Sequence, residues 1–242
     1  MTEALEITVT APIVSFRNPL YAAVQVTLPC PPPSTVAGLL ASMVGGWDAM
    51  PRTTSFAMAF HARGRGTDLE TFHPLEVGKG QASPNPKERE FLTAATLTVW
   101  LTDHLDLWEK AVRRPVWPLR FGRSQDLASA RARRIVLGSQ PGRQGYALVP
   151  DSVSQAGTRL RLPAAISRDR ARTTWLDTAT PLQEVTTCSP PAVLLRKAKQ
   201  WCCWKTFTLT LSWSTLHEPA ATGLGEKRSP RNHTGGAAHR PP

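Results

Sequence analysis

Apolar and polar residues alternate along Leu5–Val14, and this period of two predicts a strand with one buried face. After three consecutive prolines the period becomes that of a helix, with one apolar stripe formed by Val36, Leu39, Leu40, Met43 and Val44. Ser34 is expected to cap the start of this helix, and Gly45 and Gly46 to end it in a left-handed conformation. The first fifty residues therefore predict the beginning of a β-α-β unit.

Three further strands and a second helix are predicted up to residue 121. Ser55–Ala62 alternates, and Phe91–Leu101 is rich in β-branched and apolar residues, so both favour strands. Asp103–Arg114 has one apolar face, acids at its start and arginines at its end, which predicts a helix that Pro115 stops. Val116–Phe121 is expected to be the last strand. The order β-α-β-β-α-β is that of the ferredoxin-like fold, which RNA-recognition domains also adopt.

The stretch between the two middle strands is polar and rich in glycine. Arg63–Gly66 is expected to break the second strand as a flexible basic turn, and Thr71–Val77 to return toward the sheet. Gly78–Glu90 contains Gly, Pro, Ser and Lys without an apolar period, so it predicts an exposed loop or the tip of a hairpin.

Beyond residue 130 the chain changes to short extended runs, at Arg133–Leu137, Gly145–Val149, Arg159–Pro163, Thr173–Leu176 and Trp204–Trp213. The prediction is an α+β protein in three parts: a ferredoxin-like domain over residues 1–130, a smaller β-rich part over 131–216 and a disordered basic tail over 217–242. Three tryptophans are expected in the core rather than as stacking platforms, namely Trp117, Trp204 and Trp213.

The charge of the chain is unevenly distributed. The formal net charge is +11, yet residues 1–112 carry −3, whereas residues 113–172 carry +10 from 13 arginines, no lysine and 3 aspartates. Arginine binds phosphate bidentately and stacks on bases, so this block indicates a nucleic-acid partner. The alternative is a solvated basic face in a protein whose composition favours Arg over Lys.

Other classes of function find no support in the sequence. Four cysteines without a CxxC pair argue against a structural zinc site or a disulfide framework, so no metal is expected. No apolar run approaches the ~18 residues of a membrane span, and no secretory signal is visible, so we expect a cytoplasmic prokaryotic protein without membrane contact. Walker, HExxH and GxSxG patterns are absent from the sequence, and no cofactor is implied.

Three short motifs become informative when they are considered together. They are Phe16-Arg17 after the first strand, PPPST at Pro31–Thr35, and GRSQDL at Gly122–Leu127. In this order on a ferredoxin-like frame, they resemble the Cas-five family of CRISPR-associated proteins, in the branch found in type I-B systems. The resemblance covers residues 5–130, and Gln125 stands where that branch usually has an acid.

The resemblance implies a structural subunit of the Cascade complex that caps the 5′ handle of the CRISPR RNA. It implies a β-hairpin, called the thumb, which would lie within about residues 62–90 and carry the cations Arg63, Arg65, Lys79 and Lys87. The implied protein partners are the Cas-seven backbone subunit and the Cas-eight large subunit. The Cas-six ribonuclease is a further candidate partner, and target DNA would be met only indirectly.

Single-stranded RNA is held by cations on phosphates and planar groups on bases, which selects candidate contacts near the motifs. The candidate RNA-binding residues are Arg17, Tyr21, Ser34, Arg63, Arg65, Lys79, Arg120, Gly122, Arg123 and Ser124. Gly122 would let the backbone approach a nucleotide closely. Free amides near Ser34 and Thr35 would bind a phosphate at the helix start, although a capping role for Ser34 explains that residue equally.

No catalytic residue is predicted, but an enzymatic alternative stays open. One branch of the same family, in type I-C systems, cuts the CRISPR RNA precursor, and metal-free RNA cleavage needs a base near the 2′-hydroxyl. The candidates for such a metal-independent endoribonuclease are His61 and His73, with Tyr21 and Lys79. A basic RNA-binding module unrelated to CRISPR is the third hypothesis.

Overall fold

The computed structural model describes residues 2–21, 25–72, 85–138, 143–151, 157–167, 169 and 171–180, together with three short strands within 186–212. Three groups of sequence predictions lie outside these residues. They concern the tail over 217–242, the residues Lys79 and His73, and the tryptophans Trp204 and Trp213.

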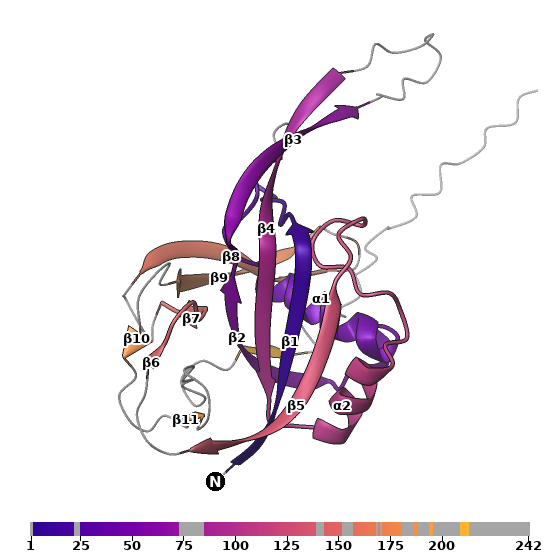
Figure 1. The fold of residues 1–242 in the computed structure, drawn as a ribbon, viewed down its shortest axis with the longest axis vertical. Coiled ribbons are helices and arrows are strands. Elements are labelled where there is room, and N and C mark those ends of the chain that lie inside the picture. Colours follow the sequence, from indigo (N-terminus) through magenta and orange to yellow (C-terminus); the bar gives the residue numbers. More distant parts are fainter. Residues whose placement is uncertain are drawn as a thin grey trace, which may run out of the picture.

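The main sheet has the connectivity of the ferredoxin-like fold (Figure 1). The elements follow in the order β1 (Thr2–Val14), α1 (Pro33–Val44), β2 (Thr53–His61), β3 (Gly64–Phe72), β4 (Asn85–Leu101), α2 (Leu105–Arg113) and β5 (Ser129–Gly138). The strands lie side by side as β5-β1-β4-β2, and every pairing among them is antiparallel. The predicted α+β class is confirmed.

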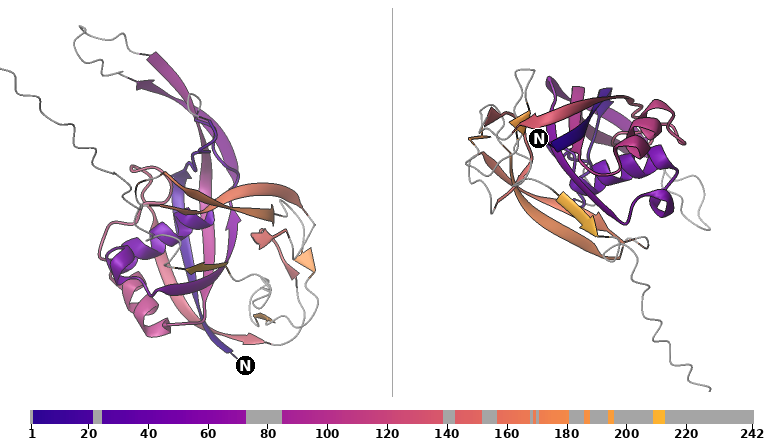
Figure 2. Two further views of the ribbon diagram at one scale, coloured as in Figure 1. Left: turned by 180° about the vertical axis from the view of Figure 1, so that it is seen from behind. Right: turned by 90° about the horizontal axis from the view of Figure 1, so that it is seen from below.

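Both helices cover the same face of this sheet, and the core lies between them and the strands (Figure 2). Its central side chains come from β1, α1 and α2 and are at most 1% exposed: Leu5, Ile7, Val9, Val36, Leu40, Met43 and Trp108. Burial of each such side chain contributes about 1.5–3 kcal/mol, so the predicted apolar stripe of α1 holds this helix on the sheet.

The last strand is not where the sequence predicts it. Val116–Phe121 forms no strand, because Pro115 and Pro118 cannot donate to a ladder. The Val116 and Trp117 amides instead donate to the carbonyls of Met43 and Ser42 at the end of α1. Trp117 is therefore 51% exposed, against the expectation of burial. The fourth strand is β5, which includes the run Arg133–Leu137 that was expected in the second part.

The ends of α1 confirm one prediction and correct another. Gly45 has a φ of +96° and ends the helix, as predicted. At the other end Pro32 is the N-cap residue and no side chain caps the helix, so the expected Ser34 cap is wrong. The Thr35 amide donates to the Pro32 carbonyl at 2.9 Å and is not free for a phosphate.

β3 and β4 form a hairpin that extends beyond the main sheet (Figure 1). The predicted turn at Arg63–Gly66 is wrong, since Gly64 begins a strand that runs outward to Phe72. Most of the predicted return over Thr71–Val77 lies outside the described residues. The glycines fit because cross-strand side chains cover them. A Cβ on Gly66 would lie 2.6 Å from the Phe91 ring, so the aromatic ring takes the place of a side chain there.

The described strands that follow β5 include a second, smaller sheet that packs on the core of the main sheet. β7 (Val149–Pro150), β9 (Thr173–Thr180) and β8 (Thr158–Ile166) make a three-stranded sheet, with β8 against α1. Leu160, Leu162 and Leu176 from this sheet pack on the main core. The remaining strands are short: β6 (Arg143–Gln144) pairs with β10 (Thr186–Thr187), β11 (Leu194–Leu195) with β5, and β12 (Leu209–Ser212) with β2.

Candidate nucleic-acid interface

Two of the three sequence motifs meet through aromatic rings. Phe16 follows β1 and Phe121 directly precedes the GRSQDL segment, and their ring centroids lie 5.0 Å apart with a T-shaped arrangement. Phe60 of β2 completes the cluster at 5.5 and 6.2 Å from these rings. All three are buried, and edge-to-face pairs add about 0.5–1.5 kcal/mol beyond their area. The phenylalanines of the motifs are therefore structural.

Asp126 is the hub of this region and is only 5% exposed. Its Oδ2 accepts hydrogen bonds from the Ser15 amide at 3.1 Å and from the Arg123 amide at 2.9 Å. The Arg123 guanidinium Nε donates to the same carboxylate at 3.1 Å. Burial would lower the pKa of Arg123, but the hydrogen bond and charge of Asp126 outweigh it and raise this pKa. The carboxylate thus ties the GRSQDL turn to the end of β1.

Gly122 is required by this close packing. It has a φ of +112°, and a Cβ would lie 2.7 Å from the Ser15 carbonyl oxygen and 3.0 Å from Asp126 Oδ2. The close approach that requires glycine at position 122 is therefore made by the backbone of Ser15. A contact between Gly122 and a nucleotide stays a prediction.

The base of the β3–β4 hairpin is fixed to the same region through Glu90. Its Oε2 accepts from the Thr27 amide at 3.0 Å and forms an ion pair with Arg65, while Ser15 Oγ donates to its carbonyl at 2.7 Å. Burial raises the pKa of Glu90, but the bonds from Arg65 and the Thr27 amide more than offset it, so its pKa lies below the usual range. These contacts hold the hairpin base against the loop before α1.

A second set of ion pairs links arginines to the acidic side chains of β3 at the base of the hairpin. The side chain of Arg89 is 6% exposed and pairs with Glu70, whose pKa the Arg89 hydrogen bond lowers. Arg123 Nη1 lies 3.5 Å from Asp68 Oδ2, which links the GRSQDL turn to β3. We call the network of Arg65, Asp68, Glu70, Arg89, Glu90, Arg123 and Asp126 the brace.

The candidate RNA contacts divide into two groups. Arg65 and Arg123 belong to the brace and already pair with carboxylates. Exposed side chains surround it instead, namely those of Arg17, Tyr21, Arg63, Arg120 and Ser124, with Tyr21 50% exposed. Within the described residues, Arg63 and Arg120 have no carboxylate within ion-pair distance.

Ser34 lies apart from these groups, half-buried in the first turn of α1 among buried prolines. The residues that sequence reasoning missed are the carboxylates of the brace, chiefly Asp126 and Glu90. The signal for Asp126 is its position three residues after Arg123 in a turn, where an aspartate commonly accepts backbone amides.

The histidine candidate for catalysis lies at the end of β2. The His61 ring packs edge-to-face on Tyr146, with centroids 4.7 Å apart, and Tyr146 has a φ of +59°. Non-glycine residues in this left-handed region store strain that often accompanies function. Nowhere in the described part of the chain are three metal-ligating side chains grouped together.

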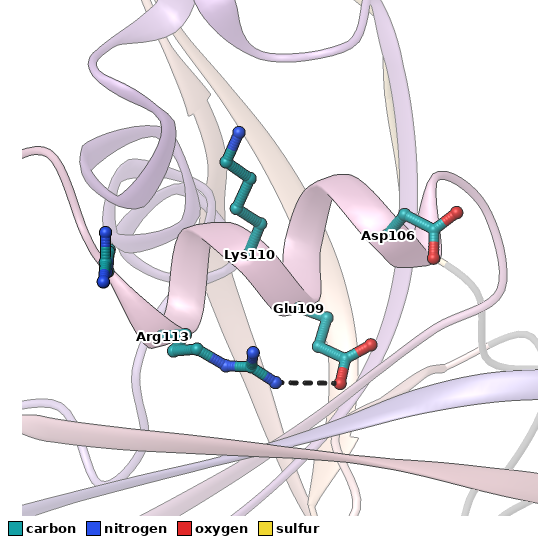
Figure 3. Close-up of a pocket in the computed structure, with 5 residues that line it drawn as sticks. Asp106, Glu109, Lys110 and Arg113 are labelled. Carbon is teal, nitrogen blue, oxygen red and sulfur yellow. Dashed lines mark ion pairs between the residues drawn. The ribbon is translucent and has the colours of Figure 1, made fainter.

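A depression on α2 differs from the surface around the brace because acidic and basic side chains line it together. It has a volume of about 380 Å³ and is lined by Asp106, Glu109, Lys110, Arg113 and Arg114 (Figure 3). Arg113 pairs with Glu109 at 3.5 Å. Because both signs of charge line it and partly cancel, this site does not favour an anionic ligand.

The fold and the surface around the brace define a class. A four-stranded antiparallel sheet with β-α-β-β-α-β connectivity, two helices on one face and a projecting hairpin is a ferredoxin-like fold, which RNA-recognition domains also adopt. In the described residues no helix has the length and apolarity to cross a bilayer.

The chain belongs to the Cas5 family, the Cas-five family of the sequence motifs, because the family model described as "CRISPR-associated protein (Cas_Cas5)" matches residues 4–177. Two solved structures share the fold. A chain of a "CRISPR RNA-guided surveillance complex" aligns with a TM-score of 0.52 and 14% identity, over 78% of this chain and 91% of that one. A chain of a type III-B Cmr-beta complex bound to cognate target RNA aligns with a TM-score of 0.52 and 8% identity, over 75% and 86%. No curated protein sequence matches significantly.

Proposed function

We propose that the protein is a non-catalytic RNA-binding subunit of a type I CRISPR effector complex, in which it caps the 5′ handle of the guide RNA. The observation that carries the proposal is the convergence of the Phe16-Arg17 loop, the GRSQDL turn and the hairpin base on one brace. A rigid frame that presents exposed cations suits a fixed RNA end, since less entropy is lost on binding.

The RNA contacts in this proposal are the exposed side chains around the brace. Arg63 and Arg120 supply charge for phosphates, and Tyr21 supplies a ring on which a base can stack. Arg65 and Arg123 act indirectly by holding the hairpin and the turn. Membership of the family and the resemblance in sequence support contacts with the Cas-seven backbone subunit and the Cas-eight large subunit.

Co-purification from cells that carry the remaining subunit genes and a CRISPR array tests the assignment. The tagged chain is expected to retain the backbone subunit and a guide RNA whose 5′ end is the repeat-derived handle. Arg63→Ala/Arg120→Ala should reduce retained guide RNA at least severalfold, while Arg114→Ala, on the α2 side, should not. A parent protein that purifies without RNA and without other subunits contradicts the proposal.

The His61–Tyr146 pair favours a second candidate, a metal-independent endoribonuclease acting on the CRISPR RNA precursor. The imidazole is the natural base for a 2′-hydroxyl. Labelled repeat RNA incubated with the protein in EDTA separates the two candidates. Cleavage that His61→Ala abolishes supports the enzyme, and intact RNA supports the non-catalytic subunit.

A further inference from the structure

The face of the main sheet that carries no helix is apolar and buried at one end, around Ala57, Trp100 and Leu137, and becomes polar toward Thr10 and Thr96. The side chains of Leu5, Ile7 and Val9 point into the helix-side core, so the alternate residues of β1 lie on the opposite face. The pairing of neighbouring strands aligns these residues with residues of β5, β4 and β2 in three rows that run across the sheet. The rows are Arg133–Glu6–Trp100–Ala57, Arg131–Thr8–Thr98–Ala59 and Ser129–Thr10–Thr96–His61.

Two depressions lie along these rows and share Thr96. One has a volume of about 490 Å³ and includes Thr8, Thr98 and Arg131 in its lining. The other, about 560 Å³, includes Thr10, Ser129 and Arg63 and approaches the point where β2 passes into β3. Together they make one trough along the strands, which we call the threonine trough. Figure 1 looks onto this face of the sheet.

The charges of the trough leave a positive surplus. Glu6 is its acid, and Arg133 pairs with it at 2.7 Å while the Trp100 indole donates to it at 3.1 Å. Arg131 and Arg63 are exposed, and no described carboxylate lies within ion-pair distance of either. An anion in the trough therefore meets two uncompensated guanidinium groups.

We infer that the threonine trough binds the sugar–phosphate backbone of single-stranded RNA. Arg131 and Arg63 contact phosphates, and the hydroxyls of Thr8, Thr10 and Thr96 contact ribose. This inference rests on the proposed RNA-binding function and extends the RNA-binding surface from Arg63, which it shares with the contacts around the brace, along the strands to Arg131.

The side chains of the trough determine what part of the RNA it reads. Sheet faces that read bases do so with exposed aromatic rings on their central strands. The central strands here carry threonine, and Trp100 is 1% exposed, so the floor offers hydrogen bonds instead of stacking. A hydroxyl both donates and accepts, as the ribose 2′-OH does, which favours RNA over DNA of the same charge. His61 and Tyr146 at the β2 edge offer the only described ring pair beside these rows.

The test measures the affinity of the full-length protein for fluorescent single-stranded RNA and DNA of one sequence at several salt concentrations. Arg131→Ala is expected to weaken RNA binding about fivefold and to reduce the slope of log K against log salt by about 0.7. Thr10→Val/Thr96→Val retains the shape and β-branching of both side chains. It should weaken RNA binding about fivefold and DNA binding less than twofold.

Two control variants match these changes. Arg114→Ala removes an exposed arginine on the helix side, and Thr158→Val removes an exposed strand hydroxyl in β8, so both should bind as the parent does. Parental RNA affinity and slope for Arg131→Ala, with loss for Arg120→Ala, would overturn the trough while leaving the proposed function intact. Equal loss of RNA and DNA in the threonine variant would overturn the ribose contacts. Loss of a co-purifying subunit at unchanged RNA affinity would identify a protein interface instead.

Discussion

The brace and the threonine trough both contain arginines, but the arginines of the two regions differ in their partners. In the brace every arginine has a carboxylate partner: Glu90 for Arg65, Glu70 for Arg89 and Asp126 for Arg123. In the trough Arg131 and Arg63 lack one among the described residues. Arginine composition therefore identifies a basic protein, but the pairing of each guanidinium decides which ones can bind phosphate and which hold the fold.

The largest effect is expected from Asp126→Ala. This change removes the acceptor of two backbone amides and leaves the Arg123 guanidinium without its buried partner, which should cost about 3–4 kcal/mol of unfolding free energy. Urea unfolding monitored by circular dichroism measures it. Asp126→Asn, which retains one acceptor oxygen, should lose about half as much, and equal losses would show that the charge carries the effect alone.

Gly122→Ala should destabilise the protein by about 2–3 kcal/mol. The added Cβ would meet the Ser15 carbonyl at 2.7 Å, and the φ of +112° is unfavourable for alanine. Gly145→Ala is the matched control, since no atom lies within 4 Å of its Cβ position. The midpoints of thermal unfolding compare the two variants, and similar midpoints would contradict the close packing described for the turn.

Arg123 and Arg120 lie three residues apart and should respond oppositely. Arg123→Gln breaks pairs with Asp126 and Asp68, so it should lower stability by about 1–2 kcal/mol. Arg120→Gln should leave stability within about 0.5 kcal/mol and weaken RNA binding about fivefold. Unfolding free energy and RNA affinity should both be measured for both variants. Loss of stability in Arg120→Gln with loss of RNA affinity alone in Arg123→Gln would contradict the division between structural and RNA-binding arginines.

The smallest effect concerns pH. The pKa values of Glu70 and Glu90 lie below normal, so their pairs stabilise the fold above about pH 4.3, the ordinary glutamate value. This contribution is lost as the pH falls through the lowered folded-state pKa. Glu90→Gln should cost about 0.5–1 kcal/mol at pH 7 and almost nothing once the pH lies below the lowered folded-state pKa of Glu90. Urea midpoints of parent and variant across this range provide the test, and a constant difference would exclude an ionic origin.

The sequence predicts what depends on local periodicity. The apolar stripe of α1, the alternating strands β1 and β2, and the glycine exit at Gly45 follow from spacing alone, and the structure confirms these elements. The errors arise where distant segments compete for the backbone. The Val116 and Trp117 amides donate to carbonyls at the end of α1, so this segment forms no strand and β5 is the last strand of the main sheet. The Phe91 ring covers Gly66, so a glycine-rich run forms a strand.

The sequence predicted where the candidate site lies, but it identified only some of the residues that form it. The motifs located the ends of β1 and the GRSQDL turn, which do come together. Local sequence shows only part of this pairing, because Asp68, which pairs with Arg123, and Glu70, which pairs with Arg89, both lie on β3. Assigning ligands therefore needs the register of β3 with β4, which no spacing rule provides.

The salt dependence of RNA affinity tests the central claim most directly, that Arg63 and Arg120, which have no carboxylate partner among the described residues, hold guide RNA. With handle RNA and about five neutralised phosphates, the parent should show a slope of log K against log salt near −3.5, and Arg63→Ala/Arg120→Ala should reduce its magnitude by about 1.4. The control Arg113→Ala/Arg114→Ala, on the mixed-charge side of α2, should retain the parental slope. Parental slopes in the first double variant, or a parent whose RNA affinity does not depend on salt, would contradict the account.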